Sequence, residues 1–325
     1  MQTASYPIDV FVPWVNPNDD AWYHDYCQAC AEHTGDKSPQ RIRDFGTFKY
    51  LLRSIDKNMP WINKIHVLLY AHSQIPSWLN TNYSKLVIHT HNEICKPSFN
   101  QLYFTRFIGN LSDLAEHFIY LCDDQIILNP MDPTDWFVEG IPTDNAVESQ
   151  VISSNPIDEA GLLNANLTVA DQVGNHKLDF FQRLVKNSMF LAGAVTNQLK
   201  IYKNFHTGIA CIKSEYKTIM DKLSIPLDKM FTNYWFRDNN QVIPHWLYRY
   251  IRLSTGHYSQ YDMNTRIYRE ITTGNVDFIY NDLKHPYKLC CLNDILRSDD
   301  IFTDAANNVR TALDIIFPSA SPFER

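Results

Sequence analysis

Short hydrophobic runs alternate with amphipathic segments over the first 130 residues. Each run is rich in β-branched or aromatic residues, a composition typical of buried strands. The runs are residues 8–12, 65–69, 86–88 and 118–121. Between the first two runs, apolar side chains recur at the spacing of one helical face, at Phe48, Leu51, Leu52 and Ile55. Strands that alternate with helices predict an α/β fold with a mainly parallel sheet.

The pattern becomes less regular from residue 155 onward. Residues 155–204 begin as a polar stretch and continue with helical spacing, so we expect a helical insertion or lid there. Farther along we expect helices at 215–223, 241–253 and 305–317 and a strand at 289–292. Asp238 or Asn239 is the expected cap of the second of these helices. No internal repeat, low-complexity tract or linker is present, which favours a single domain.

Two adjacent carboxylates, Asp123 and Asp124, directly follow the run at 118–121. Open α/β sheets bind ligands at the carboxyl ends of their strands. Neighbouring carboxylates repel each other, and a divalent cation relieves that repulsion. The alternative is a polar turn, because Asp is common in turns and residues 125–128 could return as the second strand of a hairpin. This stretch alone leaves both interpretations open.

A second polar pair, Asn293 and Asp294, follows the expected strand at 289–292. We expect both pairs to lie along one edge of the sheet and to share a cation. A diphosphate ester on that cation would need further positive charge, and a guanidinium binds phosphate with two parallel hydrogen bonds. The candidate arginines are Arg43, Arg53 and Arg237.

His206, which precedes Thr207 and Gly208, is a candidate proton acceptor or phosphate ligand, although a lone histidine is more often structural. Each arginine alone is likewise more often a solvated surface group. The chemistry therefore depends on these side chains acting together.

Composition excludes several function classes. The formal net charge of −7, with no Lys/Arg block, argues against a nucleic-acid binder. No apolar run approaches the roughly 20 residues that span a bilayer, and the N-terminus lacks a secretory signal pattern, so we expect a cytoplasmic protein. The sequence has no GxGxxG, Walker, GxSxG or HExxH motif, which removes the usual signatures of several enzyme classes.

The seven cysteines are best interpreted as reduced thiols. Cys27 and Cys30 form a CxxC, but no second CxxC accompanies it. A structural role is therefore favoured over a zinc site, and Cys290 and Cys291 fit a buried strand.

Four segments, in order, match a known protein family. The first is 8–16 with Asp19 and Trp22, similar to an IDVVYTWVDGSDPxW pattern. The long second segment runs from Arg43-Asp44 through residues 97–100 to Asp123-Asp124. The third contains His206 and Phe236-Arg237, and the fourth is 291–294. The chain thus resembles the Stealth family of sugar-1-phosphate transferases, which includes bacterial capsule-polysaccharide phosphotransferases and the catalytic subunit of lysosomal N-acetylglucosamine-1-phosphotransferase.

The resemblance implies a GT-A-like, Rossmann-like core with a mainly parallel sheet and helical insertions. It implies one catalytic domain over residues 1–325, with a nucleotide-sugar-binding half at 1–154. The insertion or lid at 155–204 would follow, and residues 205–325 would complete the active site and add a C-terminal helix.

The implied reaction joins a hexose 1-phosphate from a UDP-hexose or UDP-N-acetylhexosamine to a hydroxyl of a glycan or lipid-linked glycan, and UMP leaves. A lipid-linked acceptor would bring the protein to the inner face of the membrane. Mg²⁺ or Mn²⁺ would be held by Asp123, Asp124, Asn293 and Asp294. Arg237 would stabilise developing charge, and His206 or one of the Asp123-Asp124 pair would accept the acceptor proton.

The residues assigned to the donor nucleotide and its phosphates are Trp14, Asn16, Arg43, Asp44, Arg53 and Asn100. The chain departs from the family pattern where acidic or polar residues are usual, at Asn16, Phe45, Thr47 and Thr105. A changed donor or acceptor, or impaired activity, would follow from these departures. A conventional GT-A glycosyltransferase and a non-catalytic sugar-binding relative therefore stay as alternatives.

Overall fold

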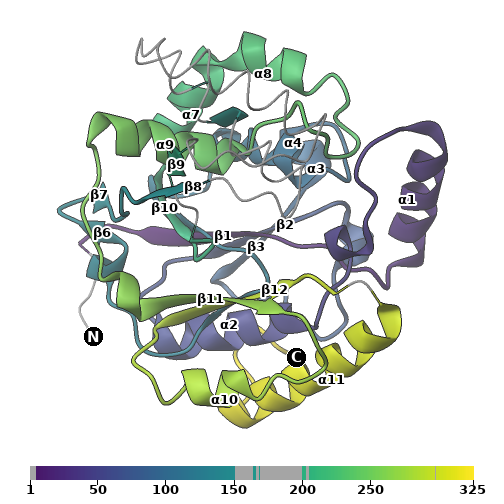
Figure 1. The fold of residues 1–325 in the computed structure, drawn as a ribbon, viewed down its shortest axis with the longest axis vertical. Helices are drawn as coiled ribbons and strands as arrows, with labels where there is room; N and C mark the ends of the chain where they lie inside the picture. The colour runs from purple at the N-terminus through teal and green to yellow at the C-terminus, as the bar shows by residue number, and fades with distance from the viewer. Residues whose placement is uncertain (1–4, 151–163, 166–167, 169–199, 203–204, 297) are drawn as a thin grey trace.

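The computed structural model describes residues 5–150, 164–165, 168, 200–202, 205–296 and 298–325. A five-stranded sheet in the order β10-β4-β1-β2-β3 crosses the middle of the molecule (Figure 1). Its strands are β1 (Ile8–Pro13), β2 (Ile65–Leu69), β3 (Leu86–Thr90), β4 (His117–Tyr120) and β10 (Ile209–Ile212). The first four pair in parallel, and β10 is antiparallel to β4. The predicted α/β fold with a mainly parallel sheet is confirmed.

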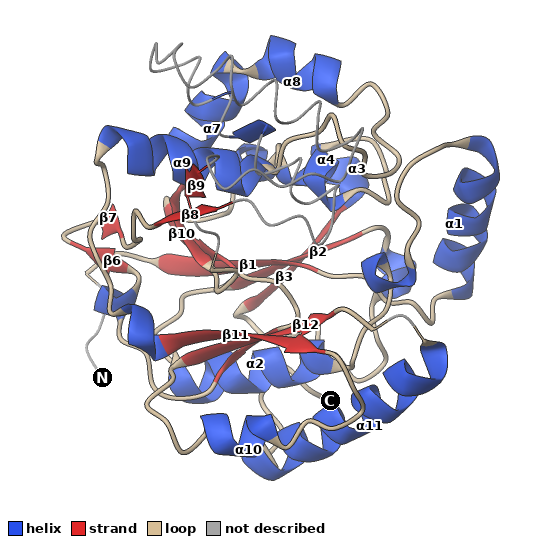
Figure 2. Ribbon diagram, in the orientation of Figure 1, coloured by secondary structure: helices blue, strands red, loops and turns tan. Residues whose placement is uncertain are grey.

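A second sheet has the order β11-β12-β5, and Figure 2 labels its strands β11 and β12. It contains β5 (Gln125–Ile127), β11 (Arg266–Ile271) and β12 (Leu289–Asp294). The hairpin alternative for residues 125–128 is wrong, because β5 pairs with β12 and not with β4. The expectation that both polar pairs follow strands of one sheet is also wrong, since β4 and β12 belong to different sheets.

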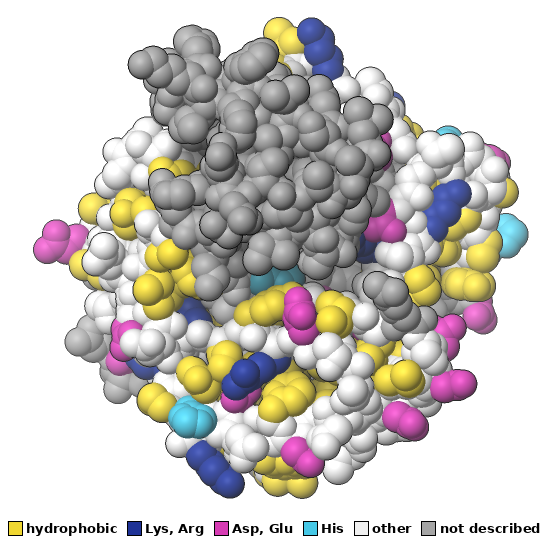
Figure 3. All heavy atoms as spheres, in the orientation of Figure 1, with side chains coloured by type: hydrophobic (Ala, Val, Ile, Leu, Met, Phe, Trp, Pro, Cys, Tyr) yellow, Lys and Arg dark blue, Asp and Glu magenta, His cyan; other side chains and the backbone are white. Residues whose placement is uncertain are grey.

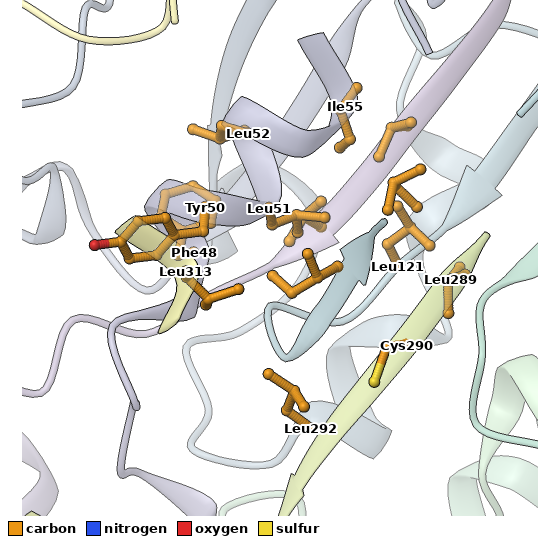
Figure 4. Packing of buried hydrophobic residues seen from close by; sticks show 14 of the residues in the cluster. Phe48, Tyr50, Leu51, Leu52, Ile55, Leu121, Leu289, Cys290, Leu292 and Leu313 are labelled. Atoms are coloured by element: carbon orange, nitrogen blue, oxygen red, sulfur yellow. The ribbon is translucent and has the colours of Figure 1, made fainter. Parts of the chain in front are cut away.

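The amphipathic helix α2 (Thr47–Asn58) packs against this second sheet (Figure 4). The predicted stripe is fully buried, because Phe48, Leu51, Leu52 and Ile55 are each at most 2% exposed. Polar side chains of α2 also bind the outer edge of β5: Ser54 Oγ accepts from Ile127 N at 3.1 Å, and Asn58 Nδ2 donates to Ile127 O at 2.6 Å. This buried pairing satisfies backbone groups that an edge strand would otherwise leave open.

Helices cover the opposite face of the five-stranded sheet (Figure 1). They include α4 (Gln101–Thr105), α7 (Lys213–Lys222), α8 (Ser224–Met230) and α9 (Pro244–Thr255). The expected caps for α9, Asp238 and Asn239, are wrong. The N-cap is Ile243, because Pro244 occupies the first turn, where its missing N–H costs nothing.

The remaining elements complete the layers. They are α1 (Asp20–Glu32), α3 (His91–Ile94), β6 (Phe137–Val138), β7 (Ile141–Pro142), β8 (Glu148–Gln150), β9 (Lys200–Tyr202), α10 (Phe278–Asp282) and α11 (Asp299–Ile316). The closing helix α11 begins six residues before the expected 305, with Asp299 and Asp300 in its first turn, where acidic groups are favourable. The predicted insertion at 155–204 lies largely outside the described residues.

Basic side chains and cysteines are distributed over several elements of the fold. On the face shown in Figure 3, the basic side chains of the described residues are scattered and form no continuous patch. All seven cysteines are free thiols. Among the described helices, none is long and apolar enough to span a membrane.

Candidate active site

Asp123 and Asp124 lie in the short connection between β4 and β5, which joins the two sheets. The connection is held from both sides. Gln125 donates to the carbonyl of His206 at 2.9 Å and accepts from Cys122 N at 3.2 Å. From β12, Leu292 N donates to the carbonyl of Asp124 at 2.9 Å. The acidic pair is therefore placed by the junction of two sheets and not by a free turn.

Asp44 is a third carboxylate close to this pair. It precedes α2 and accepts hydrogen bonds from Gly46 N at 2.7 Å, Thr47 N at 3.2 Å and Trp14 Nε1 at 3.2 Å. Burial raises the pKa of Asp44 despite these bonds. Burial, followed by the charges of Asp44 and Asp124, raises the pKa of Asp123 well above its ordinary value. Because the charge on one of these carboxylates disfavours ionisation of its neighbours, Asp44, Asp123 and Asp124 form one acidic cluster.

His206 and Cys291 face Asp124. Cys291 Sγ lies 3.4 Å from Asp124 Oδ2 and 3.7 Å from His206 Nδ1, and one ligand atom from each of the three residues lies within 4.8 Å of the others. Burial raises the pKa of Asp124, and the His206 ring opposes that shift. Asp124 Oδ1 is buried and accepts no hydrogen bond from the described residues. An unsatisfied buried carboxylate oxygen beside two further carboxylates fits a divalent cation.

The segment that carries His206 has little conformational freedom. His206 has a φ of 49°, in the left-handed region, and Gly208 has a φ of 82°. A Cβ at Gly208 would lie 2.7 Å from Leu121 and 2.9 Å from Trp136. The close approach requires glycine there, and it fixes the histidine against the acidic connection.

Arg237 lies near Tyr120, the last residue of β4, and is connected to it through Gln101. Its guanidinium donates to Gln101 Oε1 at 2.7 Å, and Gln101 donates to the Tyr120 hydroxyl at 2.7 Å. Burial, Asp124 and Asp123 raise the pKa of the Cys122 thiol, whereas Arg237 lowers it. Burial, His206 and Arg237 together lower the pKa of His245 well below its ordinary value. Arg237 is therefore close enough to Cys122 and His245 to shift their pKa values, next to the connection that carries the acidic pair.

Arg43 and Asp294 form an ion pair with each other, whereas the sequence assigned Arg43 to the donor phosphates and Asp294 to the cation. Two guanidinium nitrogens donate to Asp294 Oδ2 at 2.8 and 3.0 Å, and the guanidinium lies 4.3 Å from the Phe302 ring centre. The other oxygen, Oδ1, accepts from Leu296 N at 2.8 Å. Asn293 pairs with Glu270 of β11 through the backbone. Metal binding by Asn293 and Asp294 stays a prediction.

The other residues predicted to bind the nucleotide-sugar donor lie in different parts of the structure. Trp14 contacts the carboxylate cluster through Asp44, and Asn16 bonds to the carbonyl of Gln74 at 3.4 Å. Asn100 is buried and donates to the carbonyl of Phe236 at 3.0 Å, which holds the segment before Arg237. Arg53 binds both oxygens of Glu324 at 2.8 Å, so its charge is compensated at the C-terminal segment.

Sequence reasoning missed Cys291 as a site residue and assigned Asp44 to the nucleotide alone. Cys291 follows Cys290 in the buried first four residues of β12, where apolar packing is the usual role of a thiol. Alternation along β12 places Cys291 and Asn293 on one face, and this spacing was the available signal.

Comparison with known proteins agrees with these motifs. Residues 41–144 match the family model described as Stealth protein CR2, conserved region 2. A capsular polysaccharide phosphotransferase WcwK of Streptococcus pneumoniae is 30% identical over 341 residues, covering 98% of each chain. The exopolysaccharide phosphotransferase cps2G of Lactiplantibacillus plantarum is 27% identical, covering 99% of this chain and 98% of its own. The receptor polysaccharide phosphotransferase WefC of Streptococcus oralis is 26% identical, covering 98% of this chain and 99% of its own.

Among solved structures, that of the galactosyltransferase LgtC with donor and acceptor sugar analogs matches 97% of this chain and 98% of its own, with a TM-score of 0.45 and 10% identity. The sequence relationships are much stronger than this structural likeness and cover nearly the whole chain. The chain belongs to the Stealth family, together with the polysaccharide phosphotransferases of capsule and exopolysaccharide formation.

Proposed function

We propose that the protein transfers a hexose 1-phosphate from a UDP-sugar to a hydroxyl of a glycan or lipid-linked glycan, forming a phosphodiester and releasing UMP. The observation that carries the proposal is the cluster of Asp44, Asp123 and Asp124, with Asp124 facing His206 and Cys291. The relatives that match this chain over nearly its whole length are named polysaccharide phosphotransferases, which supports the reaction class.

Charge neutralisation is the first requirement, because the donor diphosphate and the three carboxylates are all negative. A divalent cation, Mg²⁺ or Mn²⁺, held by Asp123 and Asp124 would supply positive charge to the donor phosphates. The unsatisfied Oδ1 of Asp124 supports this fit. Asn293 and Asp294 are proposed as further ligands, and Asp294 would then exchange one of its Arg43 contacts.

In the chemical step, the acceptor hydroxyl oxygen forms a bond to the β-phosphorus of the donor. The bond from that phosphorus to the oxygen bridging the two phosphates breaks, and UMP leaves with the electron pair. The anomeric bond stays intact, so phosphorus enters the product. Such a transfer needs in-line positioning and stabilised charge more than covalent chemistry. Arg237, positioned by Gln101, is the proposed stabiliser of the developing charge.

His206 is the proposed acceptor of the hydroxyl proton, with an aspartate of the acidic pair as the alternative. The Cys291 thiol has one proton, which it donates toward Asp124, so its sulfur is free to accept from His206 Nδ1–H. With Nδ1 protonated, His206 Nε2, which lies 4.0 Å from Cys122 Sγ, is the nitrogen that would receive the proton. Cys291 would therefore be a positioning residue that fixes the histidine tautomer.

Product analysis tests the proposal. Purified protein is incubated with a series of UDP-sugars, a glycan acceptor and Mg²⁺ or Mn²⁺, and UMP and UDP are quantified together with phosphorus NMR of the glycan. UMP release with a phosphodiester signal is the expected result. UDP release without phosphorus in the glycan would instead identify a conventional glycosyltransferase, and donor binding without release of either nucleotide would identify a non-catalytic relative. Asp123→Asn should abolish UMP release, whereas the exposed Asp221→Asn is the matched control.

A further inference from the structure

A second group of metal-ligating side chains lies outside the candidate active site. His66 is in β2, His89 is in the edge strand β3, and Asp113 precedes β4. His66 Nδ1 lies 2.9 Å from His89 Nε2, and His89 Nε2 lies 3.7 Å from Asp113 Oδ1. Ligand atoms of all three lie within 4.8 Å of one another. None of these residues belongs to the set around Asp124.

Each histidine is oriented by a carboxylate on its outer nitrogen. Asp9 Oδ2 lies 3.1 Å from His66 Nε2, and Glu93 Oε2 lies 3.2 Å from His89 Nδ1. These contacts place the ring protons on the outer nitrogens, so the inner nitrogens can act as ligands. A carboxylate bound to the far nitrogen of a histidine is the usual outer support of a metal ligand.

Asp9 is a fixed support, not an adaptable surface group. It is 1% exposed, and its oxygens also accept from Asn63 Nδ2 at 2.8 Å, Lys64 N at 3.1 Å and Ala115 N at 2.7 Å. These hydrogen bonds hold the Asp9 carboxylate in place against His66 Nε2, so the orientation of the His66 ring is fixed from outside the proposed site.

We propose that His66 Nδ1, His89 Nε2 and an Asp113 carboxylate oxygen bind a zinc ion, with water as the fourth ligand. Two imidazole nitrogens and one carboxylate oxygen favour a transition metal of intermediate softness, such as zinc, over the hard cation Mg²⁺. Tetrahedral zinc with bonds of ~2.0–2.1 Å separates neighbouring ligand atoms by about 3.3 Å. The observed separations of 2.9 and 3.7 Å bracket that value.

The open side of the site faces solvent. His66 is 0% and His89 6% exposed in their side chains, whereas the Asp113 side chain is 45% exposed. The ion would enter past Asp113 and would connect β2 and β3 to the segment that leads into β4. Metal binding would replace the direct contact between the two facing nitrogens.

Metal titration of the purified chain, stripped with a chelator, tests the site. Zinc affinity is measured against a chromophoric competitor in the wild type and in Asp113→Asn, His89→Gln, Cys291→Ser and the control Asp221→Asn. Asp113 is exposed, so its substitution leaves the fold intact, as circular dichroism would verify. We expect one zinc per chain at this site, with affinity at least about tenfold weaker in Asp113→Asn and unchanged in Asp221→Asn.

Cys291→Ser separates this site from the active-site cluster. Zinc binding that survives Cys291→Ser and is lost in His89→Gln supports the proposal, and bound Co²⁺ should then show no thiolate charge-transfer band. Equal affinity in Asp113→Asn and wild type, loss of binding in Cys291→Ser, or no zinc binding at all would each overturn it. If His66 and His89 form only a hydrogen-bonded pair, no zinc will bind.

Discussion

The Sγ atom of Cys291 lies 3.4 Å from Oδ2 of Asp124, although the two residues are 167 positions apart in the chain. The contact joins the strand β12 to the connection after β4 and makes a thiol part of the acidic cluster. If the thiol positions His206, removing it should affect the proton transfer more than donor binding.

We therefore expect Cys291→Ala to lower kcat about 10–100-fold while KM for the donor changes little. Cys291→Ser keeps a donor to Asp124 and an acceptor for His206, so it should retain most of the activity. The measurement is steady-state UMP release with the wild type and both variants. Equal activity of Cys291→Ala and wild type would contradict a positioning role, as would a loss confined to KM.

His206→Gln removes the proposed proton acceptor but keeps a side chain of similar size. We expect the transfer rate to fall about 10²–10⁴-fold, the usual contribution of a general base. His24→Gln, at an exposed position of α1, is the matched control and should behave as the wild type. A near-normal rate in folded His206→Gln would assign the proton transfer to the acidic pair.

The acidic cluster should make the stability of the metal-free protein depend on pH. Burial and neighbouring charges raise the folded-state pKa values of Asp44, Asp123 and Asp124 above the ordinary value of 3.8. The folded state then binds more protons than the unfolded state, so stability is highest where these groups are protonated and falls as pH rises through the raised values.

We expect the Tm of the chelator-treated protein to fall as the pH rises above about 4, and Asp123→Asn to reduce this fall. Added Mg²⁺ or Mn²⁺ should raise the Tm increasingly at higher pH, because the cation binds the ionised carboxylates. Thermal unfolding followed by circular dichroism across a pH series measures both effects. A Tm that responds to the cation equally in Asp123→Asn would rule out this binding site.

Glu324 near the C-terminus should be important for stability. It is 6% exposed in its side chain, and Arg53 and Lys49 contribute to a pKa lowered to about 2. A depressed pKa gives stability that is present above the ordinary value of 4.5 and is lost as pH falls toward 2.

Glu324→Gln removes the buried carboxylate that pairs with Arg53 and leaves only the exposed Asp314 near its charge, so we expect it to lower the free energy of unfolding by about 3 kcal/mol at neutral pH. Asp314→Asn is the control, because Asp314 is 62% exposed and its ion pair with Arg53 should contribute at most about 1 kcal/mol. Urea denaturation at pH 7 and pH 3 compares them. Equal stability of Glu324→Gln and wild type at pH 7 would contradict the assignment.

Local patterns predicted the elements whose burial is set by their own spacing. The stripe of Phe48, Leu51, Leu52 and Ile55 gave α2, and the run at 65–69 gave β2 with the observed bounds. Local patterns could not predict that β5 pairs with β12 and not with β4, because a short apolar strand carries no information about a partner far along the chain. The same limit explains the site: Asp123 and Asp124 were found as a pair, but their approach to Asp44 and Cys291 depends on strand pairing.

The pairing of β5 with β12 also sets an order of events during synthesis. Residues 125–127 leave the ribosome long before residues 289–294, so β5 cannot pair with β12 until residue 291 has been made. In the interval, Ser54 and Asn58 of α2 can already hold one side of β5. A contact between such distant segments forms late and slows folding. The acidic cluster would thus gain its thiol only after Cys291 has been made, and chains truncated before this residue would lack it.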